Sequence, residues 1–291
     1  MKSQTALTKF LSFFLTKIII GISFIVGVIA LAEWTGRSLL ARTQLPENAG
    51  NIILAIAESA IALLTYTFLF RVYEKRKISE LSTDAFWKNA VIGFTTGFAL
   101  QSIFILIIYL IANYSVTRIN QVSSLLPSFA AALTAGFVGE IVIRGIFFRL
   151  TEEKLGTVLT LIICVLFFAI MHLNGKGAGV LSVSSTAIEA GLLLSAAYIF
   201  SRSLWLPVFL HFAWDFAEPG VFGAINPGIT IDQSLLTSKI EGPSILTGGQ
   251  LGPQNSIQAF LLCTLASLVF LWMAKQKNNF IKPFWKRKNV S

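Results

Sequence analysis

About eight apolar segments, most of them long enough to cross a lipid bilayer, dominate this sequence of 291 residues. A transmembrane helix needs roughly 20 consecutive, mainly apolar residues. Hydrophobic residues make up 55% of the chain and charged residues only 13%, whereas soluble domains average about 45–50% and about 25%. The sequence therefore predicts an all-α fold, a polytopic membrane helix bundle. The predicted spans are residues 10–32, 51–71, 90–113, 127–149, 157–173, 181–201, 204–217 and 256–274.

The placement of lysine and arginine favours one orientation of these spans. With a cytoplasmic N-terminus, the loops predicted to lie outside hold few basic residues, namely Arg37, Arg42, Arg118, Lys176 and Lys239. Because cytoplasmic loops are enriched in Lys and Arg, both termini are predicted to be cytoplasmic. The net charge of +9 then reports topology and contact with anionic membrane lipid, and it does not indicate a nucleic acid partner.

The spans form a single predicted membrane domain, residues 1–291, because no stretch has the composition of a separate soluble domain. Its predicted parts are N-terminal helices at 10–120, a core at 125–255, and a last helix with a basic cytoplasmic tail at 256–291. The apolar run within residues 1–32 exceeds the about 7–15 residues of a signal peptide, which predicts a retained helix. The segment 218–255 is rich in Gly and Pro, and predicts a long outside loop. Two cysteines, Cys164 and Cys263, stand alone in apolar runs and are expected in the core.

Two charged residues four positions apart, Glu140 and Arg144, interrupt the fourth apolar segment. This spacing stacks both side chains on one face of a helix, where they can pair. Charged side chains inside a membrane are costly and usually face the bundle interior or a functional site. The pair therefore indicates either a site or a buried ion pair that only locks helices together.

Further titratable residues lie in neighbouring spans. The chain has two histidines: His172 ends Phe168-Ala-Ile-Met-His172, and His211 precedes Asp215 by four residues. Glu189 and Glu58 are two more carboxylates within spans, with roles in packing or in support of a site. Together these groups predict one site built from several helices.

Three kinds of chemistry fit such a cluster. A carboxylate and an imidazole can activate water for peptide hydrolysis, while a second imidazole stabilises the oxyanion. Glu140, His172 and His211 also match a known zinc ligand set, so a divalent metal such as Zn²⁺ is one expected cofactor and a metal-free mechanism is the other. Chains of Glu and His also relay protons in transporters. Residue types and spacing alone leave the three open.

The same segments resemble the three motifs of the CPBP family, the CAAX prenyl protease and bacteriocin-processing membrane proteins, also called the Abi family. The family's Glu-Glu-xxx-Arg motif corresponds to Gly139-Glu140-Ile-Val-Ile-Arg144. Its Phe-xxx-His motif corresponds to Phe168 and His172, and its His-xxx-Asn/Asp motif to His211 and Asp215. The run Leu246–Pro253 resembles a glycine-rich segment of bacterial members. The resemblance covers roughly residues 125–255.

This resemblance implies an intramembrane endopeptidase that hydrolyses a peptide bond of a membrane-associated peptide or lipidated protein. It also implies an integral, multi-pass protein of a bacterial cell membrane. By resemblance, Glu140 and His172 would activate water, and His211 and Asp215 would face the oxyanion. Arg144 and Phe168 would support them.

One position departs from the family pattern: Gly139 stands where the first motif has a glutamate. Successive residues of a helix point about 100° apart, so Glu140 does not simply replace its neighbour. Three interpretations follow. In the first, a locally loosened helix swings Glu140 toward the water. In the second, another carboxylate, Glu189 or Asp215, acts as the base. In the third, the chain is a non-catalytic membrane scaffold or bacteriocin-immunity-type protein that keeps the protease fold.

Overall fold

The structure is a computed structural model that describes residues 13–111, 113–173, 179–224 and 233–287. Within these ranges, each of the predicted apolar segments folds as a helix, which confirms the polytopic helical bundle. The helices are α2 (Phe14–Leu40), α3 (Glu47–Tyr73), α4 (Phe86–Ile111), α5 (Leu126–Thr134), α6 (Arg149–Leu155), α7 (Thr157–His172), α8 (Val180–Thr186), α9 (Leu194–Ser201), α10 (Trp205–Phe216), α11 (Ser244–Thr247) and α12 (Ile257–Gln276).

Several of these helices join into longer rods through π-helical segments. The segments are η3 (Ala135–Gly139) and η4 (Ile141–Phe148) between α5 and α6, η5 (Ala187–Leu193) between α8 and α9, and η6 (Ala217–Val221) after α10. Short 3₁₀ turns complete the helical elements: η1 (Ser79–Leu81), η2 (Val122–Leu125), η7 (Gly249–Leu251), η8 (Pro253–Asn255) and η9 (Phe284–Lys286).

Among the described residues, six rods are long and apolar enough to cross a membrane: Phe14–Leu40, Glu47–Tyr73, Phe86–Ile111, Val122–Leu155, Val180–Ser201 and Ile257–Gln276. The helices α7 and α10, with 16 and 12 residues, are shorter than the roughly 20 residues of a full span. The count of eight spans and the cytoplasmic position of both termini therefore stay predictions. Residues 1–12, which include the start of the predicted span 10–32, lie outside the described residues.

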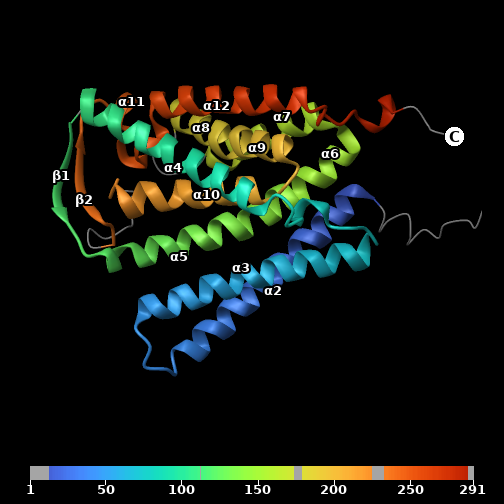
Figure 1. Cartoon of the computed structure of the whole chain (residues 1–291), viewed down its shortest axis with the longest axis horizontal. Coiled ribbons are helices and arrows are strands. Elements are labelled where there is room, and N and C mark those ends of the chain that lie inside the picture. The colour runs from blue at the N-terminus through green and yellow to red at the C-terminus, as the bar shows by residue number, and fades with distance from the viewer. Residues whose placement is uncertain (1–12, 112, 174–178, 225–232, 288–291) are drawn as a thin grey trace, which may run out of the picture.

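The helix α10 lies in the middle of the bundle, against α4, α5 and α9 (Figure 1). Every residue from Leu194 to Phe200 of α9 is buried, as expected for a helix that is apolar on all sides. The helices α2 and α3 form a hairpin that extends away from the other helices along α5 (Figure 1). Cys164 and Cys263 are buried free thiols, in agreement with their expected place in the core.

Two glycines let α4 approach α10 closely. A Cβ added at Gly93 would lie 2.4 Å from the carbonyl oxygen of Leu206, and one at Gly97 would lie 2.4 Å from that of Leu210. Both distances are far below van der Waals contact, and both neighbours are backbone atoms. The small-residue spacing in this span therefore serves helix packing, and it holds α10 in the position that the site requires.

We expect Gly97→Ala to destabilise the protein by about 1–3 kcal/mol, the usual cost of overpacking a core. The added methyl group would push α4 away from α10, because the backbone of α10 cannot move aside without the whole helix. Thermal unfolding in detergent measures the effect. Gly27→Ala, whose Cβ meets nothing within 4 Å, is the matched control and should leave the midpoint unchanged. An equal midpoint for both variants would contradict the packing role.

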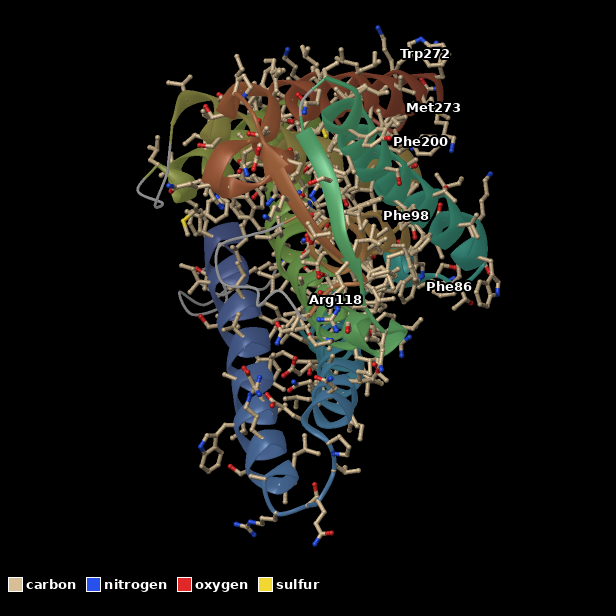
Figure 2. All side chains as sticks on the ribbon, turned by 90° about the vertical axis from the view of Figure 1, so that its left-hand side faces the viewer. Phe86, Phe98, Arg118, Phe200, Trp272 and Met273 are labelled. Carbon is tan, nitrogen blue, oxygen red and sulfur yellow. The ribbon has the colours of Figure 1, made fainter. Side chains whose placement is uncertain are left out.

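A small antiparallel sheet was missed by the all-helical prediction. The strand β1 (Asn113–Ile119) follows α4 and pairs with β2 (Leu236–Glu241) of the segment predicted as a loop. Figure 2 looks onto this end of the molecule and shows the two strands lying across the bundle, with Arg118 on β1. The sheet joins segments more than a hundred residues apart, and its short, partly polar strands carry no strong sequence signal.

At the end predicted to face the cytoplasm, buried ion pairs connect α3, η1 and α6. Glu74 contacts Arg149 at 2.9 Å and Lys17 at 3.1 Å, and Arg76 binds both Glu74 and Glu80. Burial alone would raise the pKa of Glu80, but the hydrogen bonds from Arg76 and Tyr66 outweigh it and bring the pKa below its usual 4.5. The pKa of Glu74 is lowered in the same way, against its burial, by Arg149, Lys17 and Arg76.

These lowered pKa values predict a loss of stability in acid. A carboxylate with a lower pKa in the folded than in the unfolded protein contributes stability above its unfolded pKa, and loses it as the pH falls through the folded value. The midpoint temperature of thermal unfolding should therefore decrease as the pH is lowered below about 4.5. In Glu80→Gln this fall should be smaller, because one of the two carboxylates no longer titrates. An identical pH dependence in Glu80→Gln and the parent would contradict the assignment.

Candidate active site

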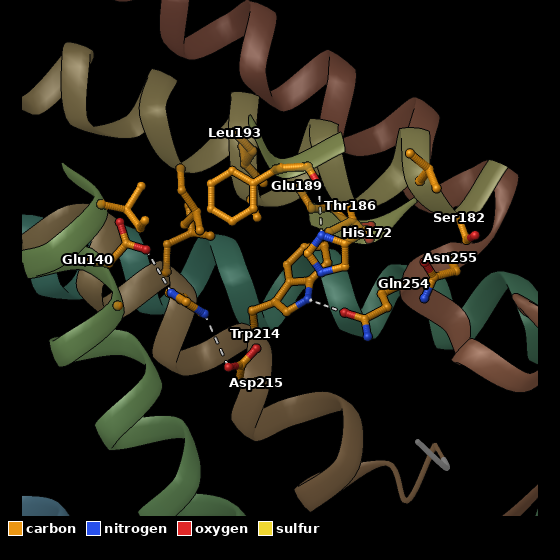
Figure 3. Close-up of a pocket in the computed structure, with 18 of the residues that line it drawn as sticks. Glu140, His172, Ser182, Thr186, Glu189, Leu193, Trp214, Asp215, Gln254 and Asn255 are labelled. Carbon is orange, nitrogen blue, oxygen red and sulfur yellow. Dashed lines mark hydrogen bonds and ion pairs between the residues drawn. The ribbon is translucent and has the colours of Figure 1, made fainter. Parts of the chain in front are cut away.

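A cavity of about 490 Å³ lies between four helical rods and the turns before α12. All the residues singled out from the sequence as site candidates line it: Gly139, Glu140, Arg144, Phe168, His172, Glu189, His211 and Asp215. Figure 3 shows the labelled members around this cavity. Glu58, in contrast, does not line it; its carboxylate accepts a hydrogen bond from Thr134 at 3.0 Å, between α3 and α5.

Four of these side chains form a chain of alternating charge. Arg144 Nη1 lies 2.9 Å from Glu140 Oε1, and the same oxygen lies 2.8 Å from His211 Nδ1. His211 Nε2 is in turn 3.3 Å from Asp215 Oδ2. A neutral imidazole offers one donor and one acceptor, whereas carboxylates only accept. Both ring nitrogens of His211 therefore donate when Glu140 and Asp215 are ionised, and the ring is then an imidazolium.

The inner half of this chain is completely buried. Glu140 is 0% and Arg144 1% exposed, and Arg144 also donates to the carbonyl oxygen of Ala190 in η5. The guanidinium carbon lies 5.5 Å from the ring centroid of Phe168, a cation–π distance. Arg144 therefore connects η4, η5 and α7 around the cavity while it neutralises Glu140.

His172 lines the same cavity but makes no direct contact with this chain of charged side chains within the described residues. Its side chain is exposed at the end of α7, and Nδ1 lies 2.9 Å from the carbonyl oxygen of Phe168. Because a carbonyl oxygen can only accept, Nδ1 carries a proton, so in the neutral ring the lone pair is on Nε2. The imidazole in direct contact with Glu140 is that of His211, and the action of Glu140 and His172 on a shared water stays a prediction.

Two carboxylates close to the cavity have no basic partner in the part of the chain that the structure describes. Glu189 is 8% exposed, and its Oε1 has no hydrogen-bond partner. Glu218 is 5% exposed, and Gln101 Nε2 donates to it at 2.9 Å. Sequence reasoning missed Glu218 because Pro219 and the glycines that follow indicate a loop. Its position three residues after Asp215 was an available signal, since i and i+3 share a helix face.

The π-helical segments coincide with the acidic residues of the site. Glu140 lies between η3 and η4, Glu189 lies in η5, and Glu218 lies in η6. A π-helical turn is less favourable than an α-helical one and is found frequently at functional sites. Gly139 and Glu140, neighbours where η3 meets η4, both line the cavity.

Gly139 faces His211 directly. A Cβ at this position would lie 3.5 Å from His211 Cε1, at ordinary contact distance, and would meet no backbone atom within 4 Å. The site therefore has room for a side chain where the family motif carries its first glutamate, and in this chain the space is left to the imidazole.

The predicted metal ligands do not fit a zinc site as they are arranged here. Both nitrogens of His211 face carboxylates, so neither is available as a metal ligand in this arrangement. Across the described ranges, no group of three or more His, Cys, Asp and Glu side chains is placed to hold a metal ion.

Comparison with family models identifies the central part of the chain. The model described as Rce1-like, type II CAAX prenyl endopeptidase Rce1-like, matches residues 121–217. This segment is similar to that family, and we call it the Rce1-like core. It contains the three motifs from Glu140 to Asp215, and the resemblance predicted from those motifs is thereby confirmed. No curated protein and no solved structure matches the chain.

The Rce1-like core covers about a third of the chain. It supplies the helices that carry the charged chain, whereas the turns η7 and η8 that close the cavity lie beyond it. The resemblance predicted for Leu246–Pro253 therefore stays a prediction.

Proposed function

We propose that this protein is a CAAX-protease-like membrane endopeptidase that hydrolyses a peptide bond of a membrane-associated substrate in the 490 Å³ cavity. The observation that carries the proposal is the convergence of two imidazoles and three carboxylates, from separate helices, on one cavity of an Rce1-like core. Few structural roles require so many titratable groups within an apolar bundle.

In the proposed mechanism, His172 is the general base. Its Nε2 lone pair takes a proton from a water molecule in the cavity, and the water oxygen attacks the carbonyl carbon of the peptide bond. When the carbon–nitrogen bond breaks, the same Nε2 returns the proton to the leaving amine. The hydrogen bond from Nδ1 to the Phe168 carbonyl oxygen supports this role, because it fixes the tautomer throughout.

His211 is the proposed donor to the oxyanion that forms when the carbonyl is attacked. Its Nδ1 is held firmly by the buried Glu140 at 2.8 Å, whereas its contact with Asp215 is longer, 3.3 Å. The Asp215 side chain is 36% exposed, so it can turn away and leave the Nε2–H for the substrate oxygen. Preorganised donors of this kind contribute strongly to acyl transfer. Glu140 and Arg144 then serve to orient His211 and hold its charge.

The cavity wall supports a substrate that approaches from the lipid. Apolar side chains of several helices line it beside the polar groups, among them Ile143, Phe168, Val183, Leu193 and Leu210. A hydrophobic peptide, or a peptide with an attached lipid chain, would bury its apolar surface there.

Cleavage of prenylated and unprenylated peptides by the purified protein tests the proposal. We expect products from at least one peptide class with the parent protein, and none with His172→Ala. The absence of histidine-dependent products across both classes would reject it.

A second candidate function is a non-catalytic scaffold that binds a peptide in the same cavity. Gly139 favours it, because this residue stands where the family motif has its first glutamate. A variant at this position separates the two. If the parent is an enzyme, Gly139→Glu should cleave at a rate within about tenfold of the parent, a change of about 1.4 kcal/mol in the barrier, because His172 already supplies the base. Gly139→Ala, which adds the Cβ without the carboxylate, is the control. Cleavage by Gly139→Glu with none by the parent would favour the scaffold.

A further inference from the structure

A second cavity, of about 250 Å³, adjoins the first. The two cavities share Trp214, Asp215 and Gln254. Trp214 Nε1 donates to Gln254 Oε1 at 3.3 Å, so two of the three shared residues contact each other where the cavities meet. Figure 3 shows this contact beside His172 and Asp215. A substrate held in the first cavity can therefore extend a side chain toward the second.

The junction of the cavities is acidic. Glu189 lines the first cavity, Glu218 lines the second, and Asp215 lines both. Glu189 is close enough to the other two for their charges to repel. Arg144 pairs with Glu140, and His211 lies between Glu140 and Asp215, so among the described residues no basic side chain pairs with Glu189 or Glu218.

Burial makes this arrangement unfavourable in the empty protein. Glu189 is more than nine-tenths buried, lines the cavity, and has one carboxylate oxygen without a hydrogen-bond partner. Taking an ionised carboxylate out of water is costly unless a cation accompanies it. A cation that enters the junction would offset this cost for Glu189 and Glu218 together.

The walls of the second cavity favour an organic cation on a flexible stem. Ala131, Ala132 and Ala135 form one side, and Trp214 and Pro219 form another. Lysine and arginine side chains pack their methylene groups along such apolar surfaces and place the charge at the far end. A metal ion fits less well, because the described residues contain no suitable group of ligands.

We propose that the second cavity and the acidic junction of Glu189, Asp215 and Glu218 form a subsite for a lysine or arginine side chain of the bound peptide. This inference rests on the proposed function, because it requires a peptide substrate in the first cavity. It adds a preference for a basic residue near the bond to be cut.

Peptide binding, measured separately from cleavage, tests the subsite. The probes are short dye-labelled alanine–leucine peptides with one lysine at successive positions, each with a twin that carries norleucine there. Fluorescence anisotropy with the protein in lipid nanodiscs gives the affinity of each pair. We expect the lysine peptide to bind at least about tenfold more tightly than its twin at one or two positions.

Substitutions of the cavity carboxylates test whether they cause the preference for lysine. Glu189→Gln and Glu218→Gln keep the side-chain size and remove the charge, and each should lower the preference for lysine to below about threefold. Glu33→Gln, on an exposed carboxylate of the α2–α3 hairpin, is the matched control and should keep it. Equal binding of both twins to the parent at every position, no binding of either, or an undiminished preference in both cavity variants would overturn the inference.

The result also separates this inference from the proposed function. The same measurements are made in the His172→Ala background, where no peptide is consumed. A lysine preference without cleavage by the otherwise unchanged protein would reject the endopeptidase and keep the subsite. Cleavage with no lysine preference would keep the endopeptidase and reject the subsite.

Discussion

His172→Ala is expected to lower kcat/KM for peptide cleavage by about 10²–10⁴-fold, the usual contribution of a general base. The loss should fall on kcat, because the imidazole takes its proton only when water attacks. Stability should change little, since the ring is exposed and its hydrogen bond is to a carbonyl of its own helix. Steady-state kinetics, together with thermal unfolding, measures both quantities.

Met171→Ala is the matched control for this variant. Met171 is the preceding residue of α7, is 64% exposed, and does not line the cavity. It should cleave like the parent. An equal loss of kcat/KM in both variants would show that the end of α7 acts only through its packing and not through the imidazole. An unchanged kcat/KM in His172→Ala would exclude His172 as the base.

Arg144→Met is expected to destabilise the protein by about 3–5 kcal/mol, the cost of leaving one partner of a buried ion pair alone. It would remove the guanidinium from the carboxylate of Glu140, which is 0% exposed and would keep only the contact with His211, and it would remove the hydrogen bond to Ala190. Unfolding in detergent measures the loss, and the addition of peptide would not restore it.

The chain provides an internal comparison for this prediction. Glu33 and Arg37 form an ion pair with the same i,i+4 spacing, but their side chains are 47% and 61% exposed. Exposed pairs contribute about 0–1 kcal/mol, so Arg37→Met should have little effect. If Arg144→Met and Arg37→Met destabilised the protein equally, the electrostatic account of the buried pair would be wrong.

Much of the bundle could be predicted from the sequence, because the bilayer imposes a length and a polarity on each segment. The predicted span 51–71 lies inside α3, and 256–274 matches α12 to within two residues at each end. The Glu140–Arg144 pair was predictable for the same reason, since a spacing of four residues fixes the contact within one helix.

The partner of Glu140 could not be predicted, because it depends on how separate helices are rotated against each other. The family resemblance joins Glu140 with His172, whereas the packing of η3 against α10 brings His211 to it. The π-helical segments add to this difficulty, since they change the direction of side chains without a clear sequence signal.

The segment 218–255 shows a second limit of the sequence. Its glycines and prolines predict a loop, yet its start continues α10, its middle pairs with β1, and its end closes the cavity with Gln254. Pairing between strands so distant in sequence is decided by tertiary contacts, and short strands carry little pattern of their own. Glu218 was overlooked as a result.

The most direct test of peptide hydrolysis in this cavity is mass spectrometry of peptide products formed in ¹⁸O-labelled water. The account predicts that the parent protein releases a fragment whose new carboxyl group carries ¹⁸O, and that His172→Ala releases none. A parent that yields no labelled fragment, or a His172→Ala variant that yields as much as the parent, would contradict it.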